Sequence, residues 1–282
     1  MPLANQKQQM KNTLAQEIVK IKKEFVIKYK GNSHIQEAIP SNSEAIQINS
    51  KDLQLLHDFA KNNPIYSNSF EMKICDTDCT VYEGDISNYW IDSIKHDTSY
   101  APFYPTWILS AYALAQQAAN MGILEAVDIG SGDGRIAYCC KVAGIRSYGI
   151  EIDKGLTELQ KTIVNKTRID FKPRAADATR FDYSIMGLHK PAFFIGGLPE
   201  IGEILANSVI KDVTAIKNLA KHAVFVLTGA TKKPQTNNAH YGWSSLMNHF
   251  KLEEVATITL PTKWTFEQPT ETPYIFTRKN TS

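Results

Sequence analysis

The stretch LEAVDIGSGDGRIAYCCKVAGIRSYGIEID, residues 124–153, decides the fold of this chain. It begins with a short apolar run, passes through three glycines at two-residue intervals, and continues into a helix-length segment and a second apolar run. Short apolar runs between turn residues are typical of buried strands. We therefore predict a strand over Leu124–Gly130, a helix over Arg135–Val142 and a second strand over Arg146–Ile152. Such a strand–helix–strand unit is the building block of a parallel sheet.

The same rhythm continues on both sides of this unit. We predict a helix over Trp107–Met121 before it and a helix from Lys154 to about Asn165 after it. Five further strands are expected at Ile169–Pro173, Ala192–Gly196, Ala223–Thr228, Leu252–Leu260 and Pro273–Arg278. Alternating strands and helices predict an α/β fold with a doubly wound, mostly parallel seven-stranded sheet in residues 96–282. The last two strands are expected to form a C-terminal antiparallel hairpin.

Residues 1–95 are predicted to form a separate, mainly helical N-terminal region. Residues 1–30 carry seven lysines against two glutamates, and their apolar side chains recur at helical spacing: Leu14, Ile18, Ile21 and Phe25. Such a helix is either a basic arm for an acidic partner or a helix docked on its own protein. We favour docking, because the apolar stripe needs a surface to cover. A second helix is expected over Asp52–Asn62, whereas residues 66–99 show no strong period.

The composition is that of a globular protein, with 43% hydrophobic and 21% charged residues. No stretch approaches the ~18 apolar residues of a membrane-spanning helix. The first thirty residues lack the apolar core of a secretory signal, so we expect a cytoplasmic protein with no membrane span. The four cysteines lie in CDTDC and YCCK, which is not the spacing of a zinc site; we expect reduced thiols and no metal. A net charge of +2 neither requires nor excludes a nucleic-acid partner.

The residues that follow the first predicted strand form a candidate ligand loop. Gly130, Gly132 and Gly134 permit positive φ and let a ligand lie directly against the backbone. Asp128 precedes the loop and Asp133 lies inside it, and two carboxylates would repel a diphosphate. They suit a ligand with a cationic end, such as the sulfonium and ammonium of S-adenosylmethionine. The loop also lacks the GKS or GKT of a phosphate-binding loop, which disfavours a nucleoside triphosphate.

Acidic residues also follow the second and third predicted strands. Glu151 lies 21 residues after Gly130, near the ~20-residue offset at which an acidic side chain reaches ribose hydroxyls. Its ionised carboxylate only accepts hydrogen bonds, which matches two vicinal hydroxyl donors. Asp153 is expected to cap the next helix. Asp177 is placed to accept the exocyclic amine of adenine, with the Ala178 N–H near a ring nitrogen.

The succession VDIGSGDGR, YGIEID and AADAT resembles the seven-strand class I methyltransferase family over residues 102–278. A narrower resemblance rests on YAPFYPTW, DIGSGDGRI, GIEID and FFIGGLPE. Together these segments are similar to the small archaeal protein-lysine methyltransferases and their mitochondrial relatives. The chain departs from that pattern in its long N-terminal region and in the loop Lys232–Trp243 after the fifth strand. Both departures leave the methyl acceptor open.

The resemblance implies S-adenosyl-L-methionine as the cofactor and indicates where it is held. The Pro105–Thr106 step would line the mouth of the site, and the segment from Gly196 to Glu200 would lie beside the transferred methyl group. The residues expected to contact the cofactor are Tyr104, Thr106, Asp128, Gly130, Ser131, Gly132, Gly134, Glu151, Ile152, Asp177, Ala178, Gly196, Gly197 and Leu198.

The resemblance also implies a lysine amine of a protein as the acceptor. A lysine must lose its proton before it accepts a methyl group, and its free pKa is ~10.4. Desolvation among aromatic side chains lowers that pKa, and Tyr104 is the candidate catalytic aromatic residue. Its neighbours Tyr100, Phe103 and Trp107 are alternatively ordinary core residues, which we favour for Trp107. Glu200 is the second catalytic candidate; it either orients the amine or caps the helix that follows.

Three residues at the end of the Lys232–Trp243 loop are candidates for an acceptor channel: His240, Tyr241 and Trp243. The alternative is that they are ordinary loop residues, which for a histidine usually means a solvated side chain.

Other acceptors and other function classes stay open at this point. The fourth predicted strand is followed by IGGLPE and not by an Asp/Asn-Pro-Pro-Tyr/Phe motif, and no Pro-Cys nucleophile occurs, which disfavours base methylation. Methylation of RNA or of a small molecule is an alternative, since a basic N-terminal helix suits RNA phosphates. A non-catalytic scaffold that only binds an adenosine ligand is another. The GSGDG loop disfavours a nicotinamide oxidoreductase.

Overall fold

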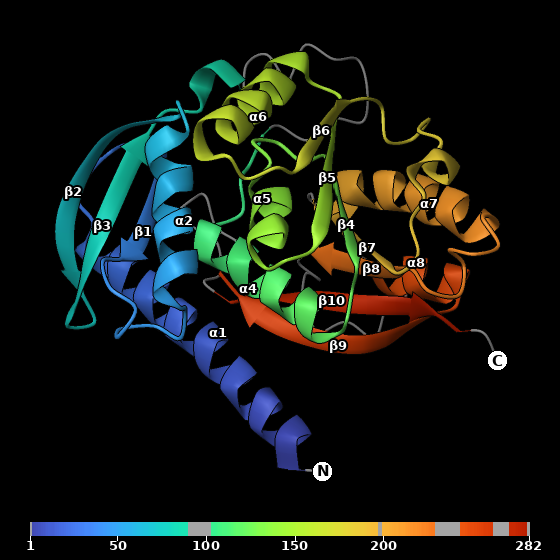
Figure 1. Ribbon diagram of the computed structural model, residues 1–282, viewed down its shortest axis with the longest axis horizontal. Coiled ribbons are helices and arrows are strands. Elements are labelled where there is room, and N and C mark those ends of the chain that lie inside the picture. Colours follow the sequence, from blue (N-terminus) through green and yellow to red (C-terminus); the bar gives the residue numbers. More distant parts are fainter. Residues whose placement is uncertain (1, 90–102, 197–198, 229–242, 262–270, 281–282) are drawn as a thin grey trace.

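The computed structural model describes residues 2–89, 103–196, 199–228, 243–261 and 271–280. These residues form a seven-stranded sheet with helices on both faces, and a smaller three-stranded sheet that belongs to the N-terminal region (Figure 1). Within these ranges, no helix combines the length and the apolar character needed to cross a membrane.

The strands of the large sheet are β4 Glu125–Ile129, β5 Arg146–Glu151, β6 Lys172–Ala175, β7 Pro191–Ile195, β8 Val224–Thr228, β9 Leu252–Leu260 and β10 Thr272–Lys279. Their order is β6-β5-β4-β7-β8-β10-β9. The first five strands of this order run parallel, and β10 pairs antiparallel with both β8 and β9. This confirms the predicted α/β fold with its mostly parallel sheet and C-terminal antiparallel hairpin. Because the chain runs outward from β4 in both directions, the strand order reverses between β4 and β7.

The helices of this part are α4 Ile108–Asn120, α5 Arg135–Val142, α6 Lys154–Thr167, the short η1 Tyr183–Met186, α7 Pro199–Ala215 and α8 Trp243–Phe250. Two hydrophobic clusters lie on opposite faces of the sheet. α4, α5 and α6 contribute to the first cluster, and η1, α7 and α8 contribute to the second. Neighbouring strand residues alternate between them, since Phe194 belongs to the first cluster and Phe193 to the second.

The N-terminal region contains α1 Pro2–Lys28, β1 Ile35–Pro40, α2 Ser50–Asn62, β2 Tyr66–Ile74 and β3 Thr77–Gly84. The three strands form an antiparallel sheet in the order β1-β3-β2. The prediction of a mainly helical region therefore found the two helices and missed this sheet. β2 is mostly polar, and the β2–β3 turn places Cys75 and Asp76 at φ 49° and 60°. Glycine or asparagine usually marks such a turn, so the sequence carried little signal for the hairpin.

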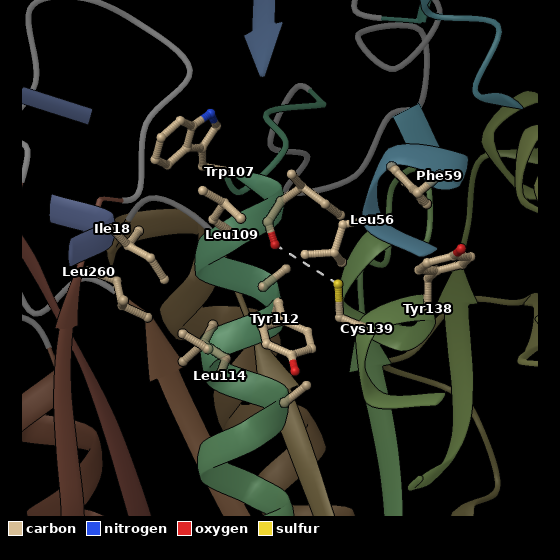
Figure 2. Packing of buried hydrophobic residues seen from close by; sticks show 14 of the residues in the cluster. Ile18, Leu56, Phe59, Trp107, Leu109, Tyr112, Leu114, Tyr138, Cys139 and Leu260 are labelled. Atoms are coloured by element: carbon tan, nitrogen blue, oxygen red, sulfur yellow. Dashed lines mark hydrogen bonds between the residues drawn. The ribbon is translucent and has the colours of Figure 1, made fainter. Parts of the chain in front are cut away.

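The predicted docking of the first helix is confirmed for its second half. Leu14, Ile18, Ile21 and Phe25 are buried and belong to the same hydrophobic cluster as α4 and α5. Figure 2 shows this packing, with Ile18 of α1 beside Leu260 of β9, two elements that are in contact. The N-terminal region and the large sheet therefore share a continuous core. The predicted boundary at residues 95 and 96 lies outside the described residues.

Two further expectations needed correction. The third strand of the sequence prediction, Ile169–Pro173, lies about three residues later, at Lys172–Ala175. The apolar residues that suggested it precede the strand, and Phe171 is 1% exposed because it packs into the core beside α5 and α6. The loop predicted over 232–243 ends in α8, whose first residue is Trp243.

We predict that replacing Gly134 by alanine destabilises the protein more than the same change at Gly144. Both glycines have positive φ, 80° and 84°, where alanine costs about 1–2 kcal/mol. A Cβ at residue 134 would also lie 2.7 Å from the ring of Phe171, whereas a Cβ at residue 144 would meet nothing within 4 Å. Crowding of this kind adds about 1–3 kcal/mol. Urea unfolding of Gly134→Ala and Gly144→Ala measures the difference; equal losses would mean that Phe171 yields without cost.

Candidate functional site

The strand register brings the predicted site residues to one rim of the sheet. β4 pairs in parallel with β5 and β7, and Ile129 lies opposite both Ile150 and Ile195. This rim is the carboxyl end of the strands at the point where strand order reverses, which is where ligands bind in such sheets. The residues that directly follow the three paired positions are Gly130, Glu151 and Gly196.

The glycine loop between β4 and α5 presents one open position to this rim. Gly130, Gly132 and Gly134 have φ values of 66°, 55° and 80°. A Cβ at Gly132 or Gly134 would collide with the ring of Phe103 or Phe171, whereas a Cβ at Gly130 would meet nothing within 4 Å. Gly130 is therefore where a ligand can approach the backbone, and the other two glycines are required by packing.

The backbone donors at the start of the loop are bonded within the protein. The N–H groups of Gly130 and Ser131 donate to the carbonyl of Ile150 at 2.9 and 3.1 Å. The N–H of Gly132 donates to Oε2 of Glu151 at 2.8 Å. A phosphate site at a glycine loop needs such donors to be available. This arrangement supports the prediction that the loop does not hold a diphosphate.

Glu151 lies at the end of β5 and is 6% exposed. Its other oxygen accepts the N–H of Asp153 at 3.0 Å. A carboxylate has about four acceptor positions, so these bonds leave capacity for a ribose hydroxyl. Burial raises the pKa of Glu151. Asp153 caps α6 as predicted, with its side chain accepting the N–H of Leu156 at 2.9 Å.

Asp128 is the most strongly perturbed of the predicted site residues. It is 4% exposed, one residue from the end of β4. Burial and the negative charge of Glu151 raise the pKa of Asp128 to about 8. A strongly perturbed carboxyl beside a ligand rim is typical of functional sites. A cation bound nearby would favour the ionised form of Asp128.

The structure corrects the role expected for Asp133. Its two oxygens accept from Nε and Nη2 of Arg135 at 2.9 and 2.6 Å, and Oδ2 also accepts from Asn63 at 2.9 Å. This charge is therefore neutralised by Arg135 inside the protein and does not face a ligand. The second carboxylate beside the open glycine is that of Glu151.

Ser131 is predicted to contact the cofactor, and its hydroxyl is directed to α6. It accepts a hydrogen bond from Nε2 of Gln160 at 2.8 Å, and the same nitrogen donates to the carbonyl of Gly132 at 2.7 Å. The side chain of Ser131 therefore supports the loop from behind, and a ligand would meet the backbone of this residue.

The third acidic position, Asp177, lies two residues after β6. Its Oδ1 accepts the N–H and the hydroxyl of Thr179 at 2.9 and 2.7 Å, and its Oδ2 lies 3.6 Å from Nε of Arg180. The side chain is 29% exposed, so it can reach a ligand. Ala178 is buried, and its carbonyl accepts the hydroxyl of Tyr183 at 2.8 Å. The adenine contacts stay predictions.

The aromatic segment before α4 lies against the loop. Phe103 is buried over Gly132, and Tyr104 and Thr106 are half-buried. The carbonyl of Thr106 accepts from Nη1 of Arg135 at 2.5 Å. Trp107 is 1% exposed and belongs to the core, as favoured from the sequence.

The remaining predicted residues are placed as follows. Ile152 and Gly196 are half-buried at the rim, and Trp243 is 2% exposed in the core formed with α7 and α8. Glu200 lies in the first turn of α7. Five candidates lie outside the described residues: Tyr100, Gly197, Leu198, His240 and Tyr241.

The residues that support the loop from the N-terminal region were not predicted from the sequence. Arg135 follows the loop directly, but no sequence pattern pairs it with Glu37 and Tyr66, or pairs Asp133 with Asn63. A surface hollow of about 670 Å³ lies elsewhere, among residues that precede β7 and β8, including His189, Lys217, Lys221 and His222. It is at the amino ends of these strands and is not part of the rim.

No protein-family model matches the chain, and no curated protein matches it. Solved structures are similar at low identity. The glycopeptide N-methyltransferase MtfA in complex with S-adenosyl-L-methionine is 10% identical, with a TM-score of 0.46 over 66% of this chain and 99% of that one. A TehB-like S-adenosylmethionine-dependent methyltransferase from Corynebacterium glutamicum is 15% identical, with a TM-score of 0.39 over 59% and 87%.

A third similar structure is the tRNA (uracil-54, C5)-methyltransferase of Pyrococcus abyssi in complex with S-adenosyl-L-homocysteine. It is 16% identical, with a TM-score of 0.44 over 62% of this chain and 39% of that one. At these identities and TM-scores the similarities carry no argument about activity, and the function has to be drawn from the site.

We predict that the ionisation of Asp128 lowers the free energy of unfolding of the protein as the pH rises. Its folded-state pKa of about 8 lies above the ordinary 3.8, so the folded protein keeps a proton that the unfolded chain releases. The stabilisation from this proton is complete below pH 3.8, declines up to about pH 8 and is absent above it. Asp128→Asn cannot ionise and should gain stability over the unchanged protein by up to ~1.4 kcal/mol per pH unit in that window. Urea unfolding from about pH 5.5 to about pH 8.5 measures this, and a constant difference would contradict it.

Proposed function

We propose that this chain is a methyltransferase that uses S-adenosyl-L-methionine. The observation that carries the proposal is a pair of buried carboxylates, Asp128 and Glu151, beside the open position of Gly130. The neighbouring backbone donors are already bonded within the protein. A phosphate would find these donors occupied and two carboxyl groups beside it, whereas a ligand with a sulfonium and an ammonium group would stabilise the ionised form of those carboxyl groups.

The residues present fit such a ligand part by part. Gly130 leaves room at its Cα for close approach to the backbone. In this proposal Glu151 accepts from the ribose hydroxyls, Asp177 accepts from the adenine amine, and Asp128 faces the cationic amino-acid end. Bound S-adenosyl-L-methionine supplies a methyl group on positively charged sulfur, so no protein nucleophile is required. The chain has to orient the acceptor and exclude water.

We further propose that the acceptor is a lysine amine of a protein. The sequence resemblance supports this, and so does the aromatic segment in which Phe103 lies against the loop and Tyr104 is half-buried. Half-buried aromatic surroundings lower the pKa of an approaching lysine, because desolvation disfavours its charged form. In this proposal Tyr104 is part of the aromatic surroundings of the lysine. Glu200, in the first turn of α7, orients the amine or receives its proton.

RNA becomes a less favoured acceptor once the first helix is considered. The second half of α1 is docked through its apolar side chains, and one of its lysines, Lys23, forms an ion pair with Glu271. The specific reason for an RNA acceptor, a basic helix available to phosphates, is weakened for these residues.

We predict that Glu151→Gln and Asp128→Asn weaken binding of S-adenosyl-L-homocysteine by about tenfold or more, since hydrogen bonds to charged groups contribute about 1.5–3 kcal/mol. Isothermal titration calorimetry measures the dissociation constants, and circular dichroism checks that the variants fold. Unchanged affinity in both variants would refute the proposed site.

Glu125→Gln is the matched control for these variants. Glu125 begins β4 at the opposite end of the sheet, and its side chain is only 2% exposed. It accepts the N–H groups of His189 and Lys190 at 3.2 and 2.9 Å. The loss of this buried charge affects stability without touching the rim, so the affinity for the ligand should stay as in the unchanged protein.

We predict that this protein transfers label from S-adenosyl-L-methionine labelled on the methyl group to protein in a cell extract, with S-adenosyl-L-homocysteine as the other product. Protease should release the label, nuclease should not, and acid hydrolysis should yield methylated lysine. Label that resists protease and is released by nuclease would assign an RNA acceptor instead. Ligand binding without any labelled product would assign a non-catalytic scaffold.

A further inference from the structure

The guanidinium of Arg135 joins the glycine loop to the N-terminal region. Arg135 is the first residue of α5 and is 2% exposed. Its Nε and Nη2 donate hydrogen bonds to the carboxylate of Asp133, which lies between the last two glycines of the loop. Its Nη1 donates to Oε1 of Glu37 at 2.5 Å and to the carbonyl of Thr106 at 2.5 Å, and Nη2 also donates to the hydroxyl of Tyr66 at 3.2 Å. A guanidinium has five N–H donors, and all five have an acceptor here.

The carboxylate of Glu37 bonds to two parts of the site: to the glycine loop through Arg135, and to the start of α4. It lies in the middle of β1 and is 1% exposed. Oε1 accepts from Arg135 and, at 3.1 Å, from the hydroxyl of Tyr66. Oε2 accepts the N–H of Ile108 at 2.9 Å, at the start of α4. The segment that precedes Ile108 carries Phe103, Tyr104 and Thr106, and is therefore fixed to the same group that fixes the loop.

We propose that Glu37 is a positioning residue of the cofactor site, which acts through Arg135 to hold the glycine loop and the Thr106 segment in their binding positions. The proposal rests on the proposed binding of S-adenosyl-L-methionine at this rim. In this proposal the N-terminal region contributes to the cofactor site, together with the glycine loop and the parallel sheet. Glu37 and Arg135 are 98 positions apart in sequence, so in this proposal the site is completed only when the N-terminal sheet docks.

The burial of the network explains why one neutral substitution should reach the ligand. In Glu37→Gln, the side-chain amide has one oxygen for the two donors Arg135 and Ile108, and its NH₂ group would face the other donor. A buried donor without an acceptor is costly, so the backbone of the loop or of the α4 start has to move. Movement of the loop changes the position of Gly130 and of the Gly132 N–H that orients Glu151.

Calorimetric titration of the full-length variants with S-adenosyl-L-homocysteine tests the proposal. Glu37→Gln should weaken binding by about tenfold or more. Its control is Glu71→Gln, which removes the same charge in the same small sheet, where Glu71 is exposed and bonds only to Ser41 and Thr80 among the contacts that the structure gives it. Glu71→Gln should bind as the unchanged protein does.

A second pair of variants covers the case in which Glu37→Gln fails to fold. Tyr66→Phe removes the hydroxyl that bonds both Arg135 and Glu37, and should weaken binding by about two- to tenfold. Tyr82→Phe removes a hydroxyl of the neighbouring strand β3 that bonds His57 at 2.8 Å and not Arg135 or Glu37 among the described contacts, and should leave the affinity unchanged. Each pair compares the same chemical change inside the Arg135 network and outside it.

The outcomes separate positioning from mere structural support. A structural role lowers the unfolding temperature of the unliganded protein but leaves the dissociation constant of the folded fraction unchanged, and that result would overturn the proposal. Equal effects in each variant and its control would overturn it as well. If the unchanged protein binds the ligand while Glu37→Gln and Tyr66→Phe bind equally well, only this inference fails. If the unchanged protein does not bind, the proposed function fails and this inference with it.

Discussion

A buried guanidinium has to satisfy every one of its donors, and this constraint at Arg135 ties the parts of the structure together. Its five N–H groups reach the loop, the segment before α4, and two strands of the N-terminal sheet. Breaking one partner of such a buried charge is strongly unfavourable, so the four segments hold one another in place. The shared hydrophobic cluster provides the buried contact surface between the N-terminal region and the large sheet, and the hydrogen bonds of the guanidinium fix how these parts are positioned relative to one another.

The charge balance around the loop follows from the same group. Within the described residues, the buried carboxyl groups in or near the loop include Glu37, Asp128, Asp133 and Glu151. Arg135 pairs with two of them, Glu37 and Asp133. The other two, Asp128 and Glu151, lie at the strand ends, and burial raises their pKa values as it raises that of Glu37. Pairing on the inner side therefore leaves two carboxyl groups without a basic partner on the ligand side. A bound cation would favour their ionised forms, which is the electrostatic basis of the proposed preference for a cation.

The parts of the fold with regular period were predictable from sequence. The helix over Arg135–Val142 has the predicted bounds, and the strands on each side differ by at most one residue at each end, because apolar runs and glycines mark them clearly. The three-stranded sheet was not predictable by these signals, since β2 is polar and its hairpin turn uses Cys75 and Asp76. Within the site, the residues at the rim could be predicted, because they directly follow the predicted strands. The pairing of Asp133 with Arg135 and of Arg135 with Glu37 could not, because such contacts depend on tertiary packing and have no fixed spacing.

The internally bonded loop has a consequence for selectivity. Many adenosine ligands share the nucleoside half and differ in what is attached at the 5′ position, so discrimination among them has to occur next to Gly130. In the proposed site, part of this discrimination comes from loop N–H groups that already donate to the carbonyl of Ile150 and to the carboxylate of Glu151, in addition to the carboxyl groups themselves. Exchanging a rim residue would weaken the binding of the proposed ligand, but it would not create a site for a nucleotide phosphate. Conversion to nucleotide specificity would require the loop to be rebuilt with a different backbone path.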